Sequence, residues 1–170
     1  MSVELIIFII LGVLAIASAI LTITARHPIV SAMSLVFNFL ILAGLYLTLN
    51  AQFISVMQVL VYAGAIMVLV IFTLMLLNLS DEEKFKYKFD YRKIIAWMIA
   101  GAFVVELIAI FTNPSISSPG ISPNSVEIGT AQNIGAELFS NYILPIEIAG
   151  ILLFGAIVGA MVMAKRKITE

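Results

Sequence analysis

The sequence has no cysteine, a single histidine (His27) and few charged residues, and each of these shortages excludes a class of function. Without cysteine the chain forms no disulfide and offers no thiolate to a metal ion. One histidine excludes paired-histidine ligation of haem or zinc within the chain. Only 11% of the residues are charged, where a soluble domain has about 25%, and a formal net charge of −1 gives no basis for binding nucleic acid.

Common motifs of nucleotide binding and nucleophilic catalysis are also missing. The sequence contains no GxGxxG, no GxxxxGK[ST] and no GxSxG. We therefore expect no metal site and no catalytic residue in this chain. If the protein takes part in redox chemistry, its cofactors are bound elsewhere.

Apolar residues are what the sequence has in abundance: 62% of 170 residues, with a mean hydropathy of +1.15. One small water-soluble core cannot bury that much apolar surface, so we expect the chain to lie in a lipid bilayer. A membrane-spanning helix needs about 20 apolar residues. Five stretches qualify, at residues 3–25, 29–49, 53–77, 94–111 and 145–164, separated by proline and helix-ending polar residues.

The predicted fold is therefore all-α: one polytopic membrane domain over residues 1–170, with five transmembrane helices. The first stretch has no basic residue before it and is longer than the core of a signal peptide, so we predict that it is a retained helix. Its packing face has the small residues Gly12, Ala15 and Ala19.

The positions of the nine Lys and Arg residues predict the orientation. They lie at Arg26, in the loop 78–93 and after the fifth helix. With five helices these places share one side of the membrane, and Lys and Arg mark the cytoplasmic side. We therefore predict a multi-pass protein of the bacterial inner membrane, with its N-terminus outside (periplasmic) and its C-terminus cytoplasmic.

The two long loops have different compositions. The outer loop, 112–142, is predicted to lack regular structure over residues 113–124 and to form a short helix at the membrane surface over 131–142. In the cytoplasmic loop, 78–93, basic and aromatic residues alternate over residues 84–92. That alternation fits an interfacial belt among lipid headgroups or a docking edge for a partner protein, and the belt is the more common arrangement.

Glu106 is the one acid well inside a predicted span, about 18 Å along the helix from Ile94. An acid at that depth is costly and suggests a functional site, although it could also reach the outer interface or bond to a neighbouring helix. Glu147 follows Pro145 by two residues, which places it in the first turn of the fifth helix, where the helix dipole favours a carboxylate. With Tyr62, these acids form a candidate proton or polar network.

Two clusters of small residues interrupt the apolar helices. Gly155 and Gly159 form a GxxxG motif, which indicates close helix packing without indicating a partner. Gly64, flanked by Ala63 and Ala65, costs the third helix about 1 kcal/mol relative to alanine. It predicts a close protein contact, and a point where the helix can bend or hold one extra residue in a π-bulge. The Tyr62 hydroxyl could bond a freed carbonyl or a water, although a plain packing patch fits the residues slightly better.

Three segments resemble one family. Val61 to Leu69, continuing through Met75-Leu76-Leu77-Asn78, resembles the third helix of the subunit J family of proton-pumping NADH-quinone oxidoreductase (respiratory complex I). Residues 27–32, His27-Pro28-Ile29-Val30-Ser31-Ala32, resemble that family's turn before helix two, and residues 144–149, Leu144-Pro145-Ile146-Glu147-Ile148-Ala149, resemble its start of helix five. The resemblance covers nearly the whole chain and is weakest over residues 112–133.

The resemblance implies a five-helix subunit of the membrane arm, beside the quinone-binding region and without a redox centre. NADH, FMN, iron–sulfur clusters and quinone would be bound by other subunits. The partners would be the other membrane-arm subunits and the lipid bilayer. The third helix would switch between a π-bulged and a regular α form, opening a water path between acids of neighbouring subunits. Glu147 matches an acid of the family, whereas Glu106 matches no family motif.

Carried over to this chain, the switching turn would be formed by seven residues: Tyr62, Ala63, Gly64, Ala65, Ile66, Met67 and Val68. Gly64 would be the pivot, and bulky Met67, Val68 and Leu69 would block or free the path. The chain would thus be a non-catalytic subunit of the enzyme. One alternative is a bracing subunit whose helix is unbroken over 62–68 in every state. Another is a small independent ion transporter, which the shortage of intramembrane ionisable groups opposes.

Overall fold

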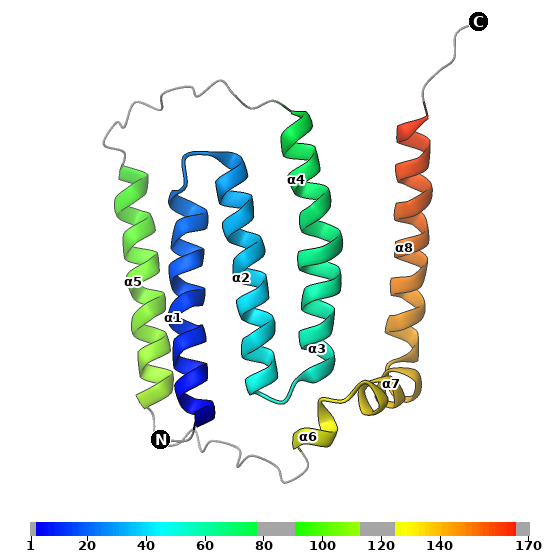
Figure 1. Cartoon of the computed structure of the whole chain (residues 1–170), viewed down its shortest axis with the longest axis horizontal. Coiled ribbons are helices and arrows are strands. Elements are labelled where there is room, and N and C mark those ends of the chain that lie inside the picture. Colours follow the sequence, from blue (N-terminus) through cyan, green and yellow to red (C-terminus); the bar gives the residue numbers. More distant parts are fainter. Residues whose placement is uncertain (1–2, 78–90, 113–124, 166–170) are drawn as a thin grey trace, which may run out of the picture.

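In the computed structural model, the described residues are 3–77, 91–112 and 125–165, and their regular structure is entirely helical. The elements are α1 (Val3–Thr24), α2 (Pro28–Thr48), α3 (Gln52–Met57), the π-helix η1 (Gln58–Ile66), α4 (Met67–Leu76), α5 (Tyr91–Thr112), α6 (Ser125–Ile128), α7 (Ala131–Ser140) and α8 (Ile143–Ala164). Helices α3, η1 and α4 are continuous and form one long helix, Gln52–Leu76 (Figure 1).

This architecture confirms an all-α multi-pass membrane protein. Four helices are long and apolar enough to cross a bilayer: α1, α2, the α3–η1–α4 helix and α8. Helix α5 has 22 residues and is apolar over Ile95–Ile110, which makes it the fifth candidate. It begins three residues before the predicted 94, because the helix continues through Tyr91-Arg92-Lys93, residues polar enough to suggest a loop. The alternating loop 84–92 and the stretch 113–124 lie mostly or wholly outside the described residues.

The bundle has two ends, which we call the N-terminal face and the C-terminal face after the chain terminus that lies at each. The N-terminal face holds the start of α1, the turn between α2 and α3, and the segments α6 and α7 (Figure 1). The C-terminal face holds the turn between α1 and α2 and the ends of α4 and α8. The α1–α2 turn forms where extended His27 precedes Pro28, because proline is well suited to the first position of a helix.

Helices α1 and α2 form a hairpin that buried polar groups hold together. The Asn38 side-chain amide of α2 donates to the Ala15 carbonyl and to Ser18 Oγ of α1, both at 2.7 Å. Asn38 and Ser18 are 9% and 6% exposed, so these bonds are shielded from solvent and lipid. In a bilayer, where apolar burial does not drive helix association, such bonds and close packing provide the attraction between helices.

Helix α2 packs on its other side against the long third helix. Ser55 Oγ donates to the Ala43 carbonyl at 2.7 Å, and the rings of Phe39 and Tyr62 pack edge to face. Among the described residues, the buried apolar ones are few and lie on α2 and the third helix: Ala32, Ile41, Ala43, Ala63 and Met67. The core is thus a three-helix row of α1, α2 and α3–η1–α4.

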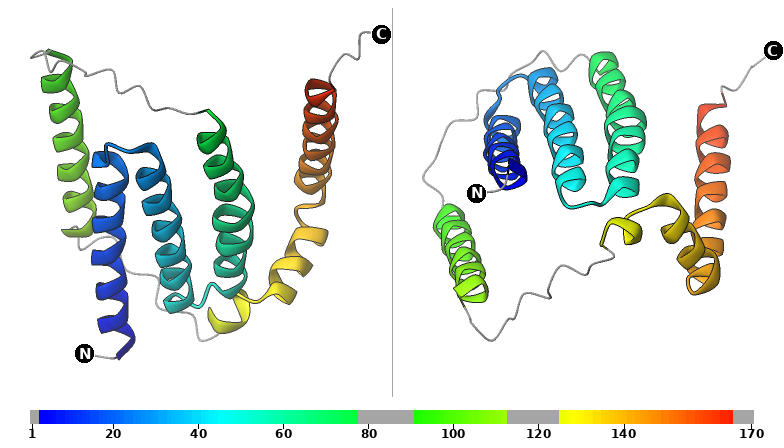
Figure 2. Two further views of the ribbon diagram at one scale, coloured as in Figure 1. Left: turned by 45° about the horizontal axis from the view of Figure 1, so that its top comes forward. Right: turned by 60° about the horizontal axis from the view of Figure 1, so that its bottom comes forward.

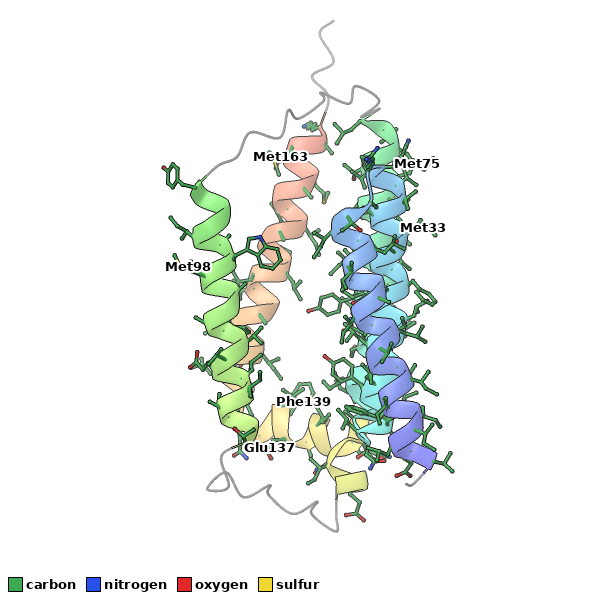
Figure 3. All side chains as sticks on the ribbon, turned by 90° about the vertical axis from the view of Figure 1, so that its left-hand side faces the viewer. Met33, Met75, Met98, Glu137, Phe139 and Met163 are labelled. Carbon is green, nitrogen blue, oxygen red and sulfur yellow. The ribbon has the colours of Figure 1, made fainter. Side chains whose placement is uncertain are left out.

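Helices α5 and α8 stand apart from this row. Among the described elements none packs against α5, and α8 is contacted by α7 alone. Figures 1 and 2 show α5 and α8 on opposite sides of this row of helices. Figure 3 shows Met98 of α5 and Met163 of α8 on the surface, and these side chains are 62% and 84% exposed. Both helices therefore present nearly their whole apolar surface to lipid or to other proteins.

The segment before α8 lies at the N-terminal face, between the start of α3 and α8 (Figure 1). The predicted short helix is present as α7, which ends at Ser140, two residues earlier than expected. Thr130 caps it, with Thr130 Oγ1 accepting a hydrogen bond from the Asn133 N–H at 3.4 Å. In Figure 3, α7 runs across the end of the bundle, with Phe139 70% exposed.

Candidate functional site

The third helix contains nine residues of π-helix, Gln58–Ile66, between two α-helical parts. At its end the Met67 N–H donates to the Tyr62 carbonyl, five residues back, where a regular α-helix would use the carbonyl of Ala63. A π-turn holds one more residue than an α-turn, so α4 is out of register with α3 by one residue. π-helices are rare and occur mostly at functional sites, which makes this segment the candidate site.

The π-helix is shifted toward the N-terminus from the predicted turn, Tyr62 to Val68. It includes Tyr62, Ala63, Gly64, Ala65 and Ile66, whereas Met67 and Val68 are the first residues of α4. This shift follows from the hydrogen bonding of a π-helix. Each backbone N–H bonds to the carbonyl five residues earlier, so the segment begins well before Gly64. The structure therefore does not have the unbroken α-helix over 62–68 that a bracing subunit would require.

Gly64 lies where the π-helix is tight. A Cβ at this position would be 3.2 Å from the Val59 carbonyl oxygen, closer than most such contacts. The close packing expected at Gly64 is, within this chain, made by its neighbour Ala63, which is 8% exposed. Gly64 and Ala65 are on the exposed side of the helix. Gly64 thus relieves crowding inside the helix and leaves a small-residue surface open to other proteins.

Tyr62 is positioned by its ring. Its centroid lies 5.6 Å from that of Phe39 on α2, with the planes at 60°, a favourable edge-to-face arrangement. The side chain is 48% exposed, so part of it remains available to a partner. This contact joins the middle of the π-helix to α2.

The three bulky residues after the π-helix do not share one direction. Met67 is 3% exposed and packs into the core, whereas Val68 and Leu69 are 62% and 66% exposed. Successive helical residues differ by about 100°, which accounts for this contrast. In this state Met67 faces the chain's own core, and that the three residues block a path in one form and free it in the other stays a prediction.

The predicted polar network is not assembled within the chain. Glu106 and Glu147 are exposed, on α5 and α8, and neither helix contacts the π-helix that holds Tyr62. Helix α8 begins at Ile143, two residues before the predicted start, so Glu147 is its fifth residue. It therefore lies beyond the first turn, where the effect of the dipole is strongest, and the dipole explanation of this acid loses force.

The GxxxG motif of α8 has no partner among the described helices of this chain. A Cβ at Gly155 or Gly159 would meet nothing within 4 Å. Its role in helix packing stays a prediction about other subunits. Likewise, the described residues contain no group of three potential metal ligands.

Sequence reasoning missed two residues near this site. Gln58, the first residue of the π-helix, is 8% exposed although it is polar. A glutamine inside an apolar span is itself a signal and could have extended the predicted segment. Gly129, in contrast, touches Asn50 in the turn before α3, which is 79 positions away in the sequence (129 minus 50), and no local pattern marks it.

Comparison with known proteins identifies similar chains along almost the whole length. A family model described as NADH-ubiquinone/plastoquinone oxidoreductase chain 6 matches residues 18–163. NAD(P)H-quinone oxidoreductase chain 6 of Leptolyngbya boryana is 36% identical over 166 residues, which are 97% of this chain and 81% of the relative. The chloroplastic NAD(P)H-quinone oxidoreductase subunit 6 of Zygnema circumcarinatum is 34% identical over 169 residues, covering 96% and 93%. NADH-quinone oxidoreductase subunit J of Escherichia coli (strain K12) is 31% identical over 156 residues, covering 90% and 82%.

Proposed function

The chain belongs to the NADH-ubiquinone/plastoquinone oxidoreductase chain 6 family and is a membrane subunit of NADH-quinone oxidoreductase; we propose that its third helix couples quinone reduction to proton translocation as a gate. The observation that carries the proposal is the π-helix at Gln58–Ile66. Its conversion to α-helix would turn one half of the third helix against the other and so change which side chains face a neighbouring subunit.

The size of that turn follows from helix geometry. Removing the extra residue from the π-turn advances α4 by one position, which is about 100° of rotation and about 1.5 Å along the axis. Each α4 residue then takes the place of the next one. Ile66 would occupy the buried place of Met67, and Met67 would move to the exposed place of Val68.

The α4 residues that would turn toward α2 in the α form are suitable for burial there. Ile66, Val70 and Thr73 would turn toward α2 in place of Met67, Ile71 and Leu74. Two of these residues are apolar, and the Thr73 hydroxyl already donates to the Leu69 carbonyl of its own helix at 2.8 Å. Neither form would leave a polar group without a partner on this face, so the second packing carries no penalty for an unpaired polar group.

The rest of the machinery would lie on other subunits. Iron–sulfur clusters require thiolates and this chain has no cysteine, so its residues do not fit such a centre. We propose that NADH, FMN, the clusters and quinone are bound elsewhere in the complex. Glu106 lies on α5, which no described element contacts, and Glu147 lies on α8, which among the described elements only α7 contacts. A proton or polar network that includes them would therefore be completed by side chains of those subunits.

The membrane placement completes the proposal. We propose one five-helix domain in the bacterial inner membrane, with the N-terminal face periplasmic and the C-terminal face cytoplasmic. The support for this orientation is the distribution of Lys and Arg in the sequence: with five spanning helices, all nine would fall on the side of the α1–α2 turn and the C-terminus.

Gly64→Leu tests the gate. A side chain at this position crowds the Val59 carbonyl in the π form, so the variant should favour the α form and hold it. We expect electron transfer from NADH to quinone to continue while proton pumping per NADH falls. Val61→Leu is the control, because it places a leucine on the same turn without removing the glycine. A normal proton stoichiometry in a correctly assembled Gly64→Leu complex would rule the gate out.

A further inference from the structure

The segment between α6 and α7 is built into the start of the third helix. A Cβ at Gly129 would lie 1.9 Å from the Asn50 carbonyl oxygen and 3.2 Å from the Ala51 Cα. No side chain fits in that space. Gly129 does not have a positive φ, so glycine is required here for the close approach and not for an unusual backbone conformation. In Figure 1, α6 lies beside the turn between α2 and α3.

This approach supplies a hydrogen bond that helix α3 lacks locally. The first N–H groups of a helix have no acceptor within it. The residue before α3, Ala51, has no side chain that could cap them. The Phe53 N–H instead donates to the Gly129 carbonyl at 3.0 Å. A residue more than seventy positions away thus acts as the cap of α3.

The turn itself adds to this anchor. Asn50 has a φ of 60°, a left-handed conformation that asparagine tolerates better than most residues. Two residues into α3 from Phe53, Ser55 is 4% exposed and bonds to the Ala43 carbonyl. The half of the third helix before the π-helix is therefore bound to α2 on one side and to Gly129 at its end.

The half after the π-helix has no such bonds. Among the hydrogen bonds of the described residues, those made by α4 stay within the third helix itself. Its contact with α2 is apolar, through side chains such as Met67. An apolar contact can be remade with a different face, whereas the bonds at Ser55 and Phe53 would break if α3 turned.

We propose that Gly129 is a positioning residue for coupling: it anchors α3, so that conversion of the π-helix turns α4 and leaves α3 still. This inference rests on the proposed gate and adds which half moves and what holds the other half. The residues of the anchor are Asn50, Phe53 and Gly129. They lie on the N-terminal face, whereas the helix that rotates, α4, extends to the C-terminal face.

Gly129→Ala tests the anchor, with Gly135→Ala as its matched control. Gly135 is on α7, and a Cβ there meets nothing within 4 Å. Both variants would be compared in the assembled complex, in sealed membrane vesicles. We expect Gly129→Ala to lose protons pumped per NADH while NADH oxidation by an artificial acceptor is kept, and Gly135→Ala to behave like the unmodified complex. Equal proton stoichiometry in an assembled Gly129→Ala complex would overturn the proposal.

A second measurement does not depend on a variant. Cryo-electron microscopy of the unmodified complex, at rest and during turnover, would compare residues 52–57 and 67–76 with α2. Rotation of 67–76 with 52–57 unchanged supports the anchor. Rotation of 52–57 overturns the anchor but keeps the gate. A π-helix at 58–66 in every particle class overturns the gate itself, and the anchor with it.

Discussion

Alanine substitutions at Ile66 and Met67 should shift the balance between the π and α forms in opposite directions. In the π form Met67 is 3% exposed, and in the α form it would take the place of Val68, which is 62% exposed. Ile66, now 43% exposed, would take the buried place of Met67. Each side chain therefore stabilises the form in which it is buried.

The magnitude follows from these fractions. Truncating a fully buried methionine or isoleucine to alanine costs at least about 2 kcal/mol, and the lower end applies because lipid replaces water around this helix. For Met67 the difference of 59% (62 minus 3) gives about 1.2 kcal/mol, or about eightfold in favour of the α form. For Ile66 the difference of 40% (43 minus 3) gives about 0.8 kcal/mol, or about fourfold in favour of the π form.

The assay is the fraction of particles with each form in cryo-electron microscopy of the assembled complex, with protons pumped per NADH measured on the same preparation. The double variant should fall between the two single variants. If Ile66→Ala and Met67→Ala move the population in the same direction, the one-residue advance of α4 is refuted. If neither variant changes the population, the third helix has no second form close enough in free energy to be populated.

Two further predictions concern the rest of the chain. Asn38→Ala removes the two Asn38 bonds from α2 to α1, while the Ser31 hydroxyl still donates to the Thr22 carbonyl. The variant should lower the stability of the hairpin by about 1 kcal/mol, measured as a lower temperature of dissociation of the complex; an unchanged temperature would show that the Asn38 bonds do not hold α1. The orientation can be read from single cysteines, since the chain has none of its own. In intact cells a membrane-impermeant maleimide should label Ser140→Cys and not His27→Cys, and the reverse pattern would invert the proposed topology.

The membrane helices could be predicted well because their signal is local. Uninterrupted apolar runs and the polar residues that end them determine both number and position, as at His27 and Pro28. Boundaries failed where polar residues continue a helix, as at Tyr91 in α5, or where a helix starts before its proline, as at Ile143 in α8. In both places backbone bonding continues beyond the apolar run.

The candidate site could be predicted only in part. Gly64 lowers the stability of the α-helix around it, which is a local signal, and the π-helix does include this residue. The direction of Met67 could not be predicted, because it depends on the register that the extra residue in the π-turn gives to α4. The anchor at Gly129 depends on a contact between segments that are distant in the sequence. A single glycine in a polar loop does not predict such a contact.

The isolation of α5 and α8 bears on how the protein is made. The hairpin α1–α2 and the third helix bury polar groups against one another, so these three helices stabilise one another within this chain. Among the described elements, α5 has no neighbour and α8 has only α7, so both helices depend on other subunits for most of their contacts. A copy that is made in excess of the other subunits would expose α5 and α8. Membrane proteases could use these exposed helices to distinguish unassembled subunits from the assembled enzyme.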